Sequence, residues 1–355
     1  MRTATFFRAL WVRLSLLAAT GLLATSAAHA QTAPDWASVQ RGSSNLGTSS
    51  GTGVAVAADG SQYVTGSFEN TFTLGAVTLT AGAGRSHVFL AKYSAAGVVL
   101  WATQLDCAGT NLFGTLAVDA AGNVYLAGPF ATSVTLGGTT LTAASDSFLA
   151  KYSPQGVLQW ARQGGGTSTS VRCIATDAAG NVAIAGGYSG YVNFGVGVTN
   201  SGTSGCFFYR LSPTGSVLQG TNVATQVGTS PFSATVFPNA LAFDGAGNAY
   251  IAGGFYGTMA FGATSLTAAF SSSTDSFLCK LDAAAAPVWA VADASTRNVG
   301  GLAVDAAGNA VVCGTPDIYL ARFTPQGVRQ WSRRITATGT GPTDMGQFTT
   351  FTPWM

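Results

Sequence analysis

The chain has 355 residues, of which only 8% are charged and 46 are glycine, so it suits short strands and tight turns better than helices. Its formal charge of +2 becomes −1 without residues 1–30, because that segment holds three Arg and no acid, which leaves 13 basic against 14 acidic residues. A nearly neutral chain without a basic patch is not expected to bind nucleic acid.

Residues 1–30 have the features of an export signal. A basic start precedes a largely apolar run, 16–24, and an Ala-x-Ala cleavage site ends at Ala30. The sequence therefore predicts a signal peptide at 1–30, a mature chain that begins at Gln31, and a secreted or cell-surface protein. No later stretch has the ~18 uninterrupted apolar residues of a membrane-spanning helix, so no transmembrane segment is expected after cleavage.

The rest of the chain is organised around the stretch LAVDAAGNVYLAG at 116–128. Near-copies of this stretch lie at 54–66, 174–186, 241–253 and 302–314. Five near-copies in one chain indicate a repeat architecture.

Each copy contains a predicted β-hairpin turn. In the second copy, Asp119 suits the first position of a type I turn and Gly122 the fourth, where φ becomes positive. The Asp position recurs in three further copies, as Asp177, Asp244 and Asp305. The first copy has Ala57 there and Asp59 two places later. Repeated Asp residues could also form a metal ring or supply catalytic carboxylates, but turn chemistry alone accounts for them.

The full repeat contains four predicted strands. In the second copy they cover 116–118, 124–127, 148–152 and 157–162, with a Gly-rich excursion at 132–143 and a second turn at 153–156. Four short strands that repeat about every 60 residues are typical of a β-propeller blade. A right-handed β-helix is the structural alternative, and a sandwich does not explain the similarity of the copies. We therefore expect an all-β propeller of about five four-stranded blades at 31–334.

Several repeats depart from this pattern. The third has Gly220 where Trp is expected, and a long link to Ala240 is predicted to be a surface loop. The fourth has Ala285 in place of the second-turn Gly, and the fifth lacks the excursion. The stretch around Trp36 resembles a fourth strand placed before the first full repeat. Residues 335–355 match no part of the repeat and are predicted to be an irregular tail. The Trp36 stretch thus adds one strand more than five four-stranded blades need, so the predicted ring closes imperfectly or the chain is truncated.

The repeat resembles the bacterial SBBP-type β-propeller repeat family. The matching pattern is V-D-x-x-G-N-x-Y-x-x-G, then F-G…L-T, then D-x-F-L-x-K-Y-x-x-x-G-x-x-x-W, over about 31–334. The resemblance implies a secreted or surface-exposed propeller, often with an adhesion-like role, and it implies no agreed catalytic residue. Family members often end in a secretion-system sorting domain, and nothing in this sequence is similar to one.

Cysteine and histidine provide few candidate sites. The five cysteines are irregularly spaced, and Cys279 and Cys313 occupy positions held by Ala in other repeats, so both are expected to be free, buried thiols. His87, the one histidine after residue 30, is expected to be a surface residue at a strand entry. It occupies a position held elsewhere by Asp146, Asp275 and Asp317. No catalytic, cofactor-binding or metal-ligating residue is assigned, and no cofactor is expected.

Two repeated side chains have both a functional and a structural interpretation. One Trp per repeat could stack on sugars, but packing between blades is favoured: Trp36, Trp101, Trp160, Trp289 and Trp331. One cation per repeat could bind an anion, but pairing with Asp or with carbonyl groups is favoured: Lys92, Lys151, Arg210, Lys280 and Arg322.

The sequence therefore favours a non-catalytic extracellular module for binding, adhesion or scaffolding, with an unidentified protein or glycan partner. An extracellular propeller enzyme acting on polysaccharide, through two Asp across a groove, is the alternative. Three or more acids in the central channel would favour the enzyme, and apolar and hydroxyl residues there would favour the module. A small-ligand sensor, the third class, would need a deep pocket.

Overall fold

The computed structural model describes residues 43–45, 48–108, 114–166, 169–199, 204–227, 235–269, 274–315 and 318–335. The predicted signal peptide, the Trp36 stretch and the tail after Ile335 lie outside these residues. The regular structure of the described residues consists of β-strands. Within them, no helix is long and apolar enough to cross a membrane.

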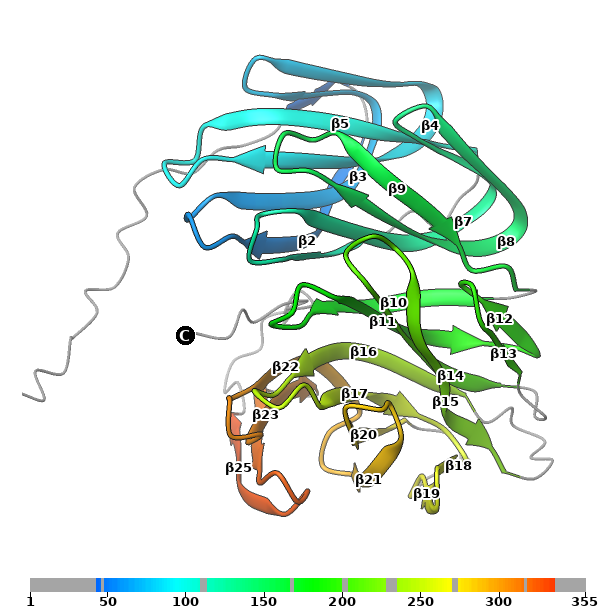
Figure 1. Cartoon of the computed structure of the whole chain (residues 1–355). Coiled ribbons are helices and arrows are strands. Elements are labelled where there is room, and N and C mark those ends of the chain that lie inside the picture. The colour runs from blue at the N-terminus through cyan, green and yellow to red at the C-terminus, as the bar shows by residue number, and fades with distance from the viewer. Residues whose placement is uncertain are drawn as a thin grey trace, which may run out of the picture. The chain divides into compact units, whose positions relative to one another are not determined.

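The strands form five antiparallel blades, each a four-stranded meander (Figure 1). Blade 1 contains β2 (Ser49–Val56), β3 (Gln62–Leu74), β4 (Val77–Tyr93) and β5 (Val99–Cys107). Blade 2 contains β6 (Thr115–Val118), β7 (Val124–Leu136), β8 (Thr139–Tyr152) and β9 (Leu158–Gln163). Blade 3 contains β10 (Thr169–Thr176), β11 (Val182–Tyr188), β14 (Gly205–Leu211) and β15 (Val217–Gln226).

Blade 4 contains β16 (Val236–Phe243), β17 (Ala249–Phe255), β20 (Asp275–Leu281) and β21 (Pro287–Asp293). Blade 5 contains β22 (Asn298–Val304), β23 (Ala310–Thr315), β24 (Ile318–Phe323) and β25 (Arg329–Ile335). The first strands of successive blades contact one another in chain order: β2 with β6, β6 with β10, β10 with β16, and β16 with β22. The predicted all-β propeller of five four-stranded blades is therefore confirmed as a fold class.

The first-turn glycines have the predicted left-handed backbone. Their φ angles run from 77° to 85° at Gly60, Gly122, Gly180, Gly247 and Gly308. In blade 2, Asp119 Oδ1 accepts hydrogen bonds from the backbone N–H of Ala121 (3.0 Å) and of Asn123 (2.9 Å). The Asn123 side-chain amide donates to Asp119 Oδ2 at 2.8 Å. In the repeated D-x-x-G-N turn, the Asp side chain therefore accepts hydrogen bonds from the turn's own backbone N–H groups and from the Asn side chain.

The predicted excursions are ordered hairpins rather than loops. In blades 1 and 2 the second and third strands continue through them, and blade 2 turns at Gly137 and Gly138. Blade 3 forms its hairpin from β12 (Tyr191–Asn193) and β13 (Gly197–Thr199), and blade 4 from β18 (Thr258–Phe261) and β19 (Thr264–Thr267). Apolar and polar residues alternate along these arms, as in a half-buried strand, so the apolar row covers the blade's own sheet. We call these four elements the extension hairpins.

The extension hairpins also join consecutive blades. The first arm of the blade 2 hairpin pairs, near its turn, with the end of the blade 1 fourth strand, where Asp106 lies opposite Thr135. In blade 4, Thr225 of β15 lies opposite Ala260 in the same way. In blade 1 this place is taken by β1 (Ser43–Asn45), with Ser43 opposite Thr73. The segment before the first repeat therefore pairs as a fourth strand of a preceding blade would.

The predicted surface loop at 220–240 is shorter than expected. β15 continues to Gln226 and β16 begins at Val236, so strand pairing extends from both sides, and residues 228–234 lie outside the described part. Pro238 lies in β16 at a bulge that precedes Ala240. A bulge accommodates a proline because it interrupts the hydrogen-bond ladder.

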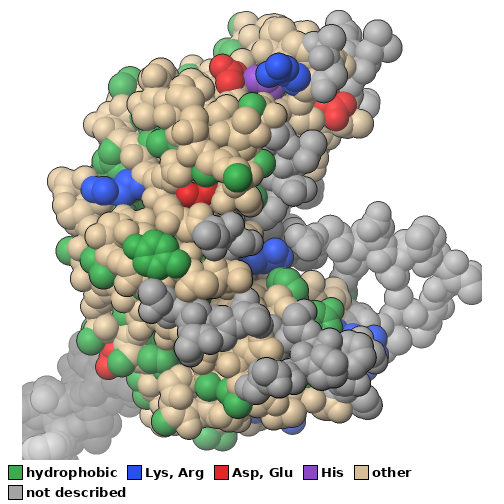
Figure 2. All heavy atoms as spheres, turned by 90° about the vertical axis from the view of Figure 1, so that its right-hand side faces the viewer, with side chains coloured by type: hydrophobic (Ala, Val, Ile, Leu, Met, Phe, Trp, Pro, Cys, Tyr) green, Lys and Arg blue, Asp and Glu red, His purple; other side chains and the backbone are tan. Residues whose placement is uncertain are grey.

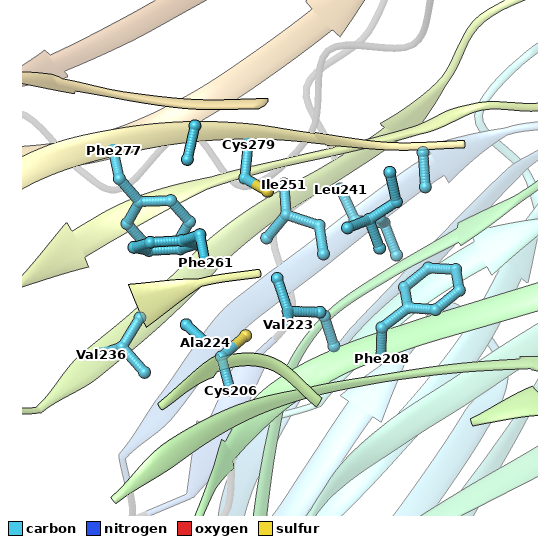
Figure 3. Packing of buried hydrophobic residues seen from close by; sticks show 14 of the residues in the cluster. Cys206, Phe208, Val223, Ala224, Val236, Leu241, Ile251, Phe261, Phe277 and Cys279 are labelled. Atoms are coloured by element: carbon cyan, nitrogen blue, oxygen red, sulfur yellow. The ribbon is translucent and has the colours of Figure 1, made fainter. Parts of the chain in front are cut away.

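The hydrophobic core lies mainly between blades. One cluster joins blades 3 and 4, with Phe208 and Val223 on one side and Leu241 and Ile251 on the other (Figure 3). Similar clusters join blades 1 and 2, 2 and 3, and 4 and 5. The aromatic residues that follow the second-strand glycine are also buried: Phe68, Phe130, Tyr188 and Phe255. Each blade is therefore stabilised by its neighbours, as in other repeat folds.

Candidate functional site

The turn aspartates pair with the cation on the third strand of the same blade. Lys280 Nζ lies 3.4 Å from Asp244 Oδ2; the Asp244 side chain is buried, and that of Lys280 is largely covered, at 12% exposure. Burial would raise the pKa of Asp244, but hydrogen bonds from Asn248 together with the Lys280 charge lower it below its usual value. The equivalent pairs are Lys151–Asp119 (3.9 Å), Arg210–Asp177 (3.9 Å) and Arg322–Asp305 (3.7 Å).

The same cations lie over tyrosine rings of the second strand. Lys92 Nζ is 5.0 Å from the centre of the Tyr63 ring, and Lys280 Nζ is 5.0 Å from that of Tyr250. A cation within about 6 Å of an aromatic centroid is attracted by the ring. The predicted partners of the cations are confirmed, because four cations pair with the turn Asp and Lys92 donates to the Pro154 carbonyl at 3.4 Å.

Three side chains of one blade reach the turns of the next blade. Between blades 1 and 2, the Tyr63 hydroxyl donates to the carbonyl of Gly122 at 2.6 Å. The Trp101 indole N–H and the Lys92 ammonium both donate to the carbonyl of Pro154, at 3.0 and 3.4 Å. We call this arrangement of Tyr, Trp and cation against the two turns of the next blade the joint.

The joint recurs along the chain with the same donors and acceptors. Trp160 and Trp289 donate to the carbonyls of Pro213 and Pro325, at 3.1 and 2.9 Å. Tyr125 and Tyr250 donate to the carbonyls of Gly180 and Gly308, at 3.2 and 3.0 Å. The predicted blade-to-blade packing of the tryptophans is thus confirmed for these positions.

The indole of each joint lies on the second-turn glycine of the next blade. A Cβ added at Gly156 would lie 2.9 Å from Trp101 Cδ2, closer than real Cβ contacts come. The same holds for Gly215 under Trp160 and for Gly327 under Trp289 (3.0 and 2.9 Å). These glycines therefore satisfy two requirements, a positive φ and room for a ring from the preceding blade.

The joint between blades 3 and 4 connects two irregularities of the sequence. The strand register places Gln219 at the Trp position of blade 3, because Gln219 lies opposite Arg210 as Trp160 lies opposite Lys151. The prediction that Gly220 holds this position is therefore wrong by one residue. Blade 4 has Ala285 at the glycine on which that Trp would lie. Ala285 retains the left-handed backbone, with φ of 64°. The Gln219 amide and the Arg210 guanidinium replace the indole as donors to the carbonyl of Ala283, at 2.7 and 3.4 Å. Loss of the ring therefore coincides with a methyl group where the ring would have lain.

The remaining repeated acids cap connections between strands. Asp146 accepts hydrogen bonds from the backbone N–H of Gly165 (2.9 Å) and from the Thr169 hydroxyl (2.5 Å), so it ties the end of β9 to β10. Asp275 accepts from the backbone N–H of Ala269 at 2.7 Å. Asp317 lies outside the described residues.

His87 is buried, contrary to the predicted surface position, because it packs against Phe68 at a centroid distance of 6.2 Å. Its Nδ1 lies 2.9 Å from Asp106 Oδ1, which also accepts from Gln104 at 2.7 Å. A proton on Nδ1 satisfies this carboxylate and leaves Nε2 without a partner among the described residues.

A charge-relay arrangement would need a nucleophile at His87 Nε2. The hydroxyl of neighbouring Ser86 instead donates to Glu69 Oε1 at 3.2 Å. Figure 2 shows the histidine beside acidic and basic side chains. Among the described residues, the cluster therefore presents no nucleophile to His87 Nε2.

The cysteines are free thiols, as predicted. Burial raises the pKa of Cys107 to about 11 and that of Cys173 to about 12. Cys206 and Cys279 project into the cluster of Figure 3, and Cys279 is fully buried as expected. Cys313 is only half-buried, which corrects the prediction, because no described blade covers that face of blade 5. Among the described residues, no three His, Cys, Asp or Glu side chains gather where they could hold a metal ion.

The first strands of blades 1, 3, 4 and 5 carry a bulge near their start. The bulged residue is Thr52 in blade 1, Arg172 in blade 3, Asn239 in blade 4 and Gly300 in blade 5. The Thr52 hydroxyl donates to the carbonyl of Gly114 at 2.9 Å, and the Arg172 guanidinium donates to Asn239 Oδ1 at 3.2 Å. Bulge positions often support function, but here the side chains bond from blade to blade.

The most regular accessible surface lies on the extension hairpins, which the sequence interpretation treated as a connecting excursion. Their outer rows carry threonines that pair across the strands: Thr73 with Thr78 (3.2 Å), Thr135 with Thr140 (2.9 Å), and Thr258 with Thr267 (3.1 Å). The signal in the sequence is the T-L-G-x-x-T-L-T that the excursions of blades 1 and 2 share, for which blade 4 has A-F-G-A-T-S-L-T. We call these outer rows the threonine rows.

Sequence comparison finds no protein-family model that matches the chain. No curated protein matches it in sequence either.

Structural comparison finds solved structures with low identity. The Pan2 WD40 domain of Neurospora crassa is 10% identical, with a TM-score of 0.43 over 81% of this chain and 66% of that one. A polysaccharide lyase of family PL25, an ulvan lyase, is 9% identical, with a TM-score of 0.42 over 79% of this chain and 68% of that one. The extracellular domain of BT4673, a putative hybrid two-component system of B. thetaiotaomicron, is 10% identical, with a TM-score of 0.38 over 86% of this chain and 35% of that one.

Proposed function

We propose that the chain is a secreted or cell-surface propeller that acts as a non-catalytic binding or adhesion module, with the threonine rows as its contact surface. The observation that supports this most directly is the division of the polar residues. The repeated Asp, Tyr, cation and Trp groups bond within and between blades, whereas the threonine hydroxyls lie on the accessible face of the extension hairpins. We also propose that the repeat belongs with the SBBP-type repeats that it resembles.

The chemistry of the threonine rows favours a neutral, hydroxyl-bearing partner. Each hydroxyl can donate and accept hydrogen bonds, and the rows of blades 1, 2 and 4 contain no charged residue. Figure 2 shows a face on which charged side chains are few. A polysaccharide offers many equivalent hydroxyl groups, so several weak contacts can add through avidity. We therefore propose a surface glycan as the partner.

A binding screen of the purified protein against glycans and whole cells tests this proposal. The proposal predicts binding that falls at least about tenfold when Thr78, Thr140 and Thr267 are all replaced by Ala, since three sites then lose contacts together. The matched control replaces Thr214 and Ser216, which are exposed hydroxyl residues outside the extension hairpins. Equal binding by the triple variant and the parent would exclude the threonine rows.

The same screen separates the binding module from the enzyme. A propeller enzyme acting on polysaccharide would release shorter products from a bound polymer, whereas a binding module leaves the polymer length unchanged. Chromatography of the polymer after incubation therefore decides between the two. Binding to a protein but to no glycan would retain the module and change its partner class.

A further inference from the structure

The joint leaves one donor face and one acceptor face uncovered at the two ends of the described repeat. Every blade offers an acceptor side to the preceding blade and a donor side to the following one. Blades 1 and 5 each have one side without a described neighbour. Each terminal side is more exposed than its equivalents in the other blades.

The donor side of blade 5 is exposed where its equivalents are buried. Strand pairing places Val311, Arg322 and Trp331 in one row across β23, β24 and β25, and Cys313, Leu320 and Arg333 in the next row. We call these six residues the trailing face. Trp331 is 38% exposed, and within the described part of the chain its indole N–H has no hydrogen-bond partner. The Arg322 side chain is 39% exposed, against 12% for Lys280 at the same position of blade 4.

The acceptor side of blade 1 is exposed in the complementary way. Val54 is 46% exposed, whereas the equivalent residues of blades 2 to 5 are at most 8% exposed: Leu116, Ile174, Leu241 and Leu302. Val56, two residues on along the same strand, is 48% exposed. The second turn at Gly97 has the left-handed backbone on which an indole lies in the other joints, with φ of 78°. Val54, Val56, Asp59, Gly60, Ala95 and Gly97 form what we call the leading face.

The two faces match in their hydrogen-bonding groups. In the joints, the indole donates to the residue two before the second-turn glycine, and Ala95 holds that place before Gly97. Blade 5 has Val311 where blades 1, 2 and 4 have Tyr, so it lacks the hydroxyl that donates to the next blade. Blade 3 also lacks this Tyr, and there Arg210 donates to the carbonyl of Gly247 at 2.8 Å. Arg322 occupies the position of Arg210, so its guanidinium can donate to the Gly60 carbonyl of a second copy in the same way.

The two faces also match in charge. Blade 1 alone has an acid next to its first-turn glycine, Asp59, where the other blades have alanine: Ala121, Ala179, Ala246 and Ala307. The trailing face carries Arg322 and the exposed Arg333. Opposite charges on facing patches favour and orient association.

We propose that the trailing face of one molecule docks on the leading face of a second copy and forms a joint between molecules. Within the chain, equivalent faces already form such a joint between four pairs of blades. Because the two faces differ, the contact is head-to-tail, and repetition gives chains or rings of molecules rather than a closed two-fold dimer.

Sedimentation velocity of the purified protein over a range of concentrations tests the proposal. We expect association that grows with concentration and that falls at least about tenfold with either Trp331→Ser on the trailing face or Val56→Glu on the leading face. Both side chains are exposed, so each variant should retain the melting temperature of the parent. Val157→Glu is the matched control, because Val157 is 59% exposed and belongs to neither face.

A mixture of the two variants tests the head-to-tail geometry. Trp331→Ser retains a leading face and Val56→Glu retains a trailing face, so an equimolar mixture should form a heterodimer and nothing larger. A mixture that stays monomeric would overturn the proposal, as would wild-type protein that stays monomeric at every concentration. In the monomeric case, the reactivity of Cys313 identifies the reason: an unreactive thiol means that the same chain covers the trailing face, and a reactive one means that the face has no partner.

Discussion

The pairing of Trp101 with Gly156 gives a quantitative test of the joint. Replacing Gly156 by Ala places a methyl group in the left-handed region, where φ is 80°, and 2.9 Å from the indole of the preceding blade. The backbone contributes about 1 kcal/mol of destabilisation. Displacing a packed ring adds about 1–3 kcal/mol. We therefore expect the free energy of unfolding to fall by about 2–4 kcal/mol.

Gly247→Ala is the matched control. Gly247 has the same φ of 80°, and a Cβ there would meet no atom within 4 Å, so only the backbone cost of about 1 kcal/mol applies. Urea unfolding measures both variants. In a Trp101→Gln background, which reproduces the natural Gln219 and Ala285 arrangement, the cost of Gly156→Ala should fall to that of the control. Equal effects of Gly156→Ala in the two backgrounds would refute the contact between ring and turn.

Three further predictions concern the first turn, a buried thiol and the export signal. Gly122→Val should destabilise by about 1–2 kcal/mol, because a β-branched residue is poorly tolerated at positive φ; coincident thermal melts of variant and parent would contradict the turn assignment. Burial raises the pKa of the Cys107 thiol to about 11 in the folded state, so its contribution to stability is complete below the unfolded pKa of about 9 and is lost as the pH rises from there through the folded pKa. Urea unfolding at rising pH should show this loss, at up to about 1.4 kcal/mol per pH unit, and Cys107→Ala should reduce the slope. N-terminal sequencing of exported protein should begin at Gln31, and a mature species that retains Arg13 would disprove the predicted cleavage.

The hairpins and blades could be predicted because their signals are local and repeated. Asp119 and Gly122 specify a turn through their own backbone and side-chain chemistry, and four further copies removed the ambiguity of a single one. Equivalence of position also identified Cys279 as a buried thiol, since the same position holds alanine in other blades.

The coupling between blades could not be predicted because it depends on which turn meets which strand in space. Gln219 and Ala285 are separated along the chain, and only the joint shows that blade 3 lacks the indole ring for which Ala285 leaves no room. Cys313 differs from Cys279 for the same reason, since its burial depends on a following blade. The extension hairpins escaped prediction because their many small residues weaken the strand signal, although the pairing of Thr135 with Thr140 is regular.

A direct comparison of a joint variant with a threonine-row variant tests the central claim that the joint groups are structural and the threonine rows bind. The joint variant is Lys151→Met, which removes the ion pair with Asp119 and the hydrogen bond to the Pro213 carbonyl (3.0 Å). Thermal melts and glycan or cell binding are measured on the same samples. The account predicts that Lys151→Met lowers the melting temperature and leaves binding by the folded protein unchanged. It predicts that the triple Ala variant of Thr78, Thr140 and Thr267 keeps the melting temperature of the parent and loses binding. Loss of binding by Lys151→Met at a temperature where it remains folded would contradict the account.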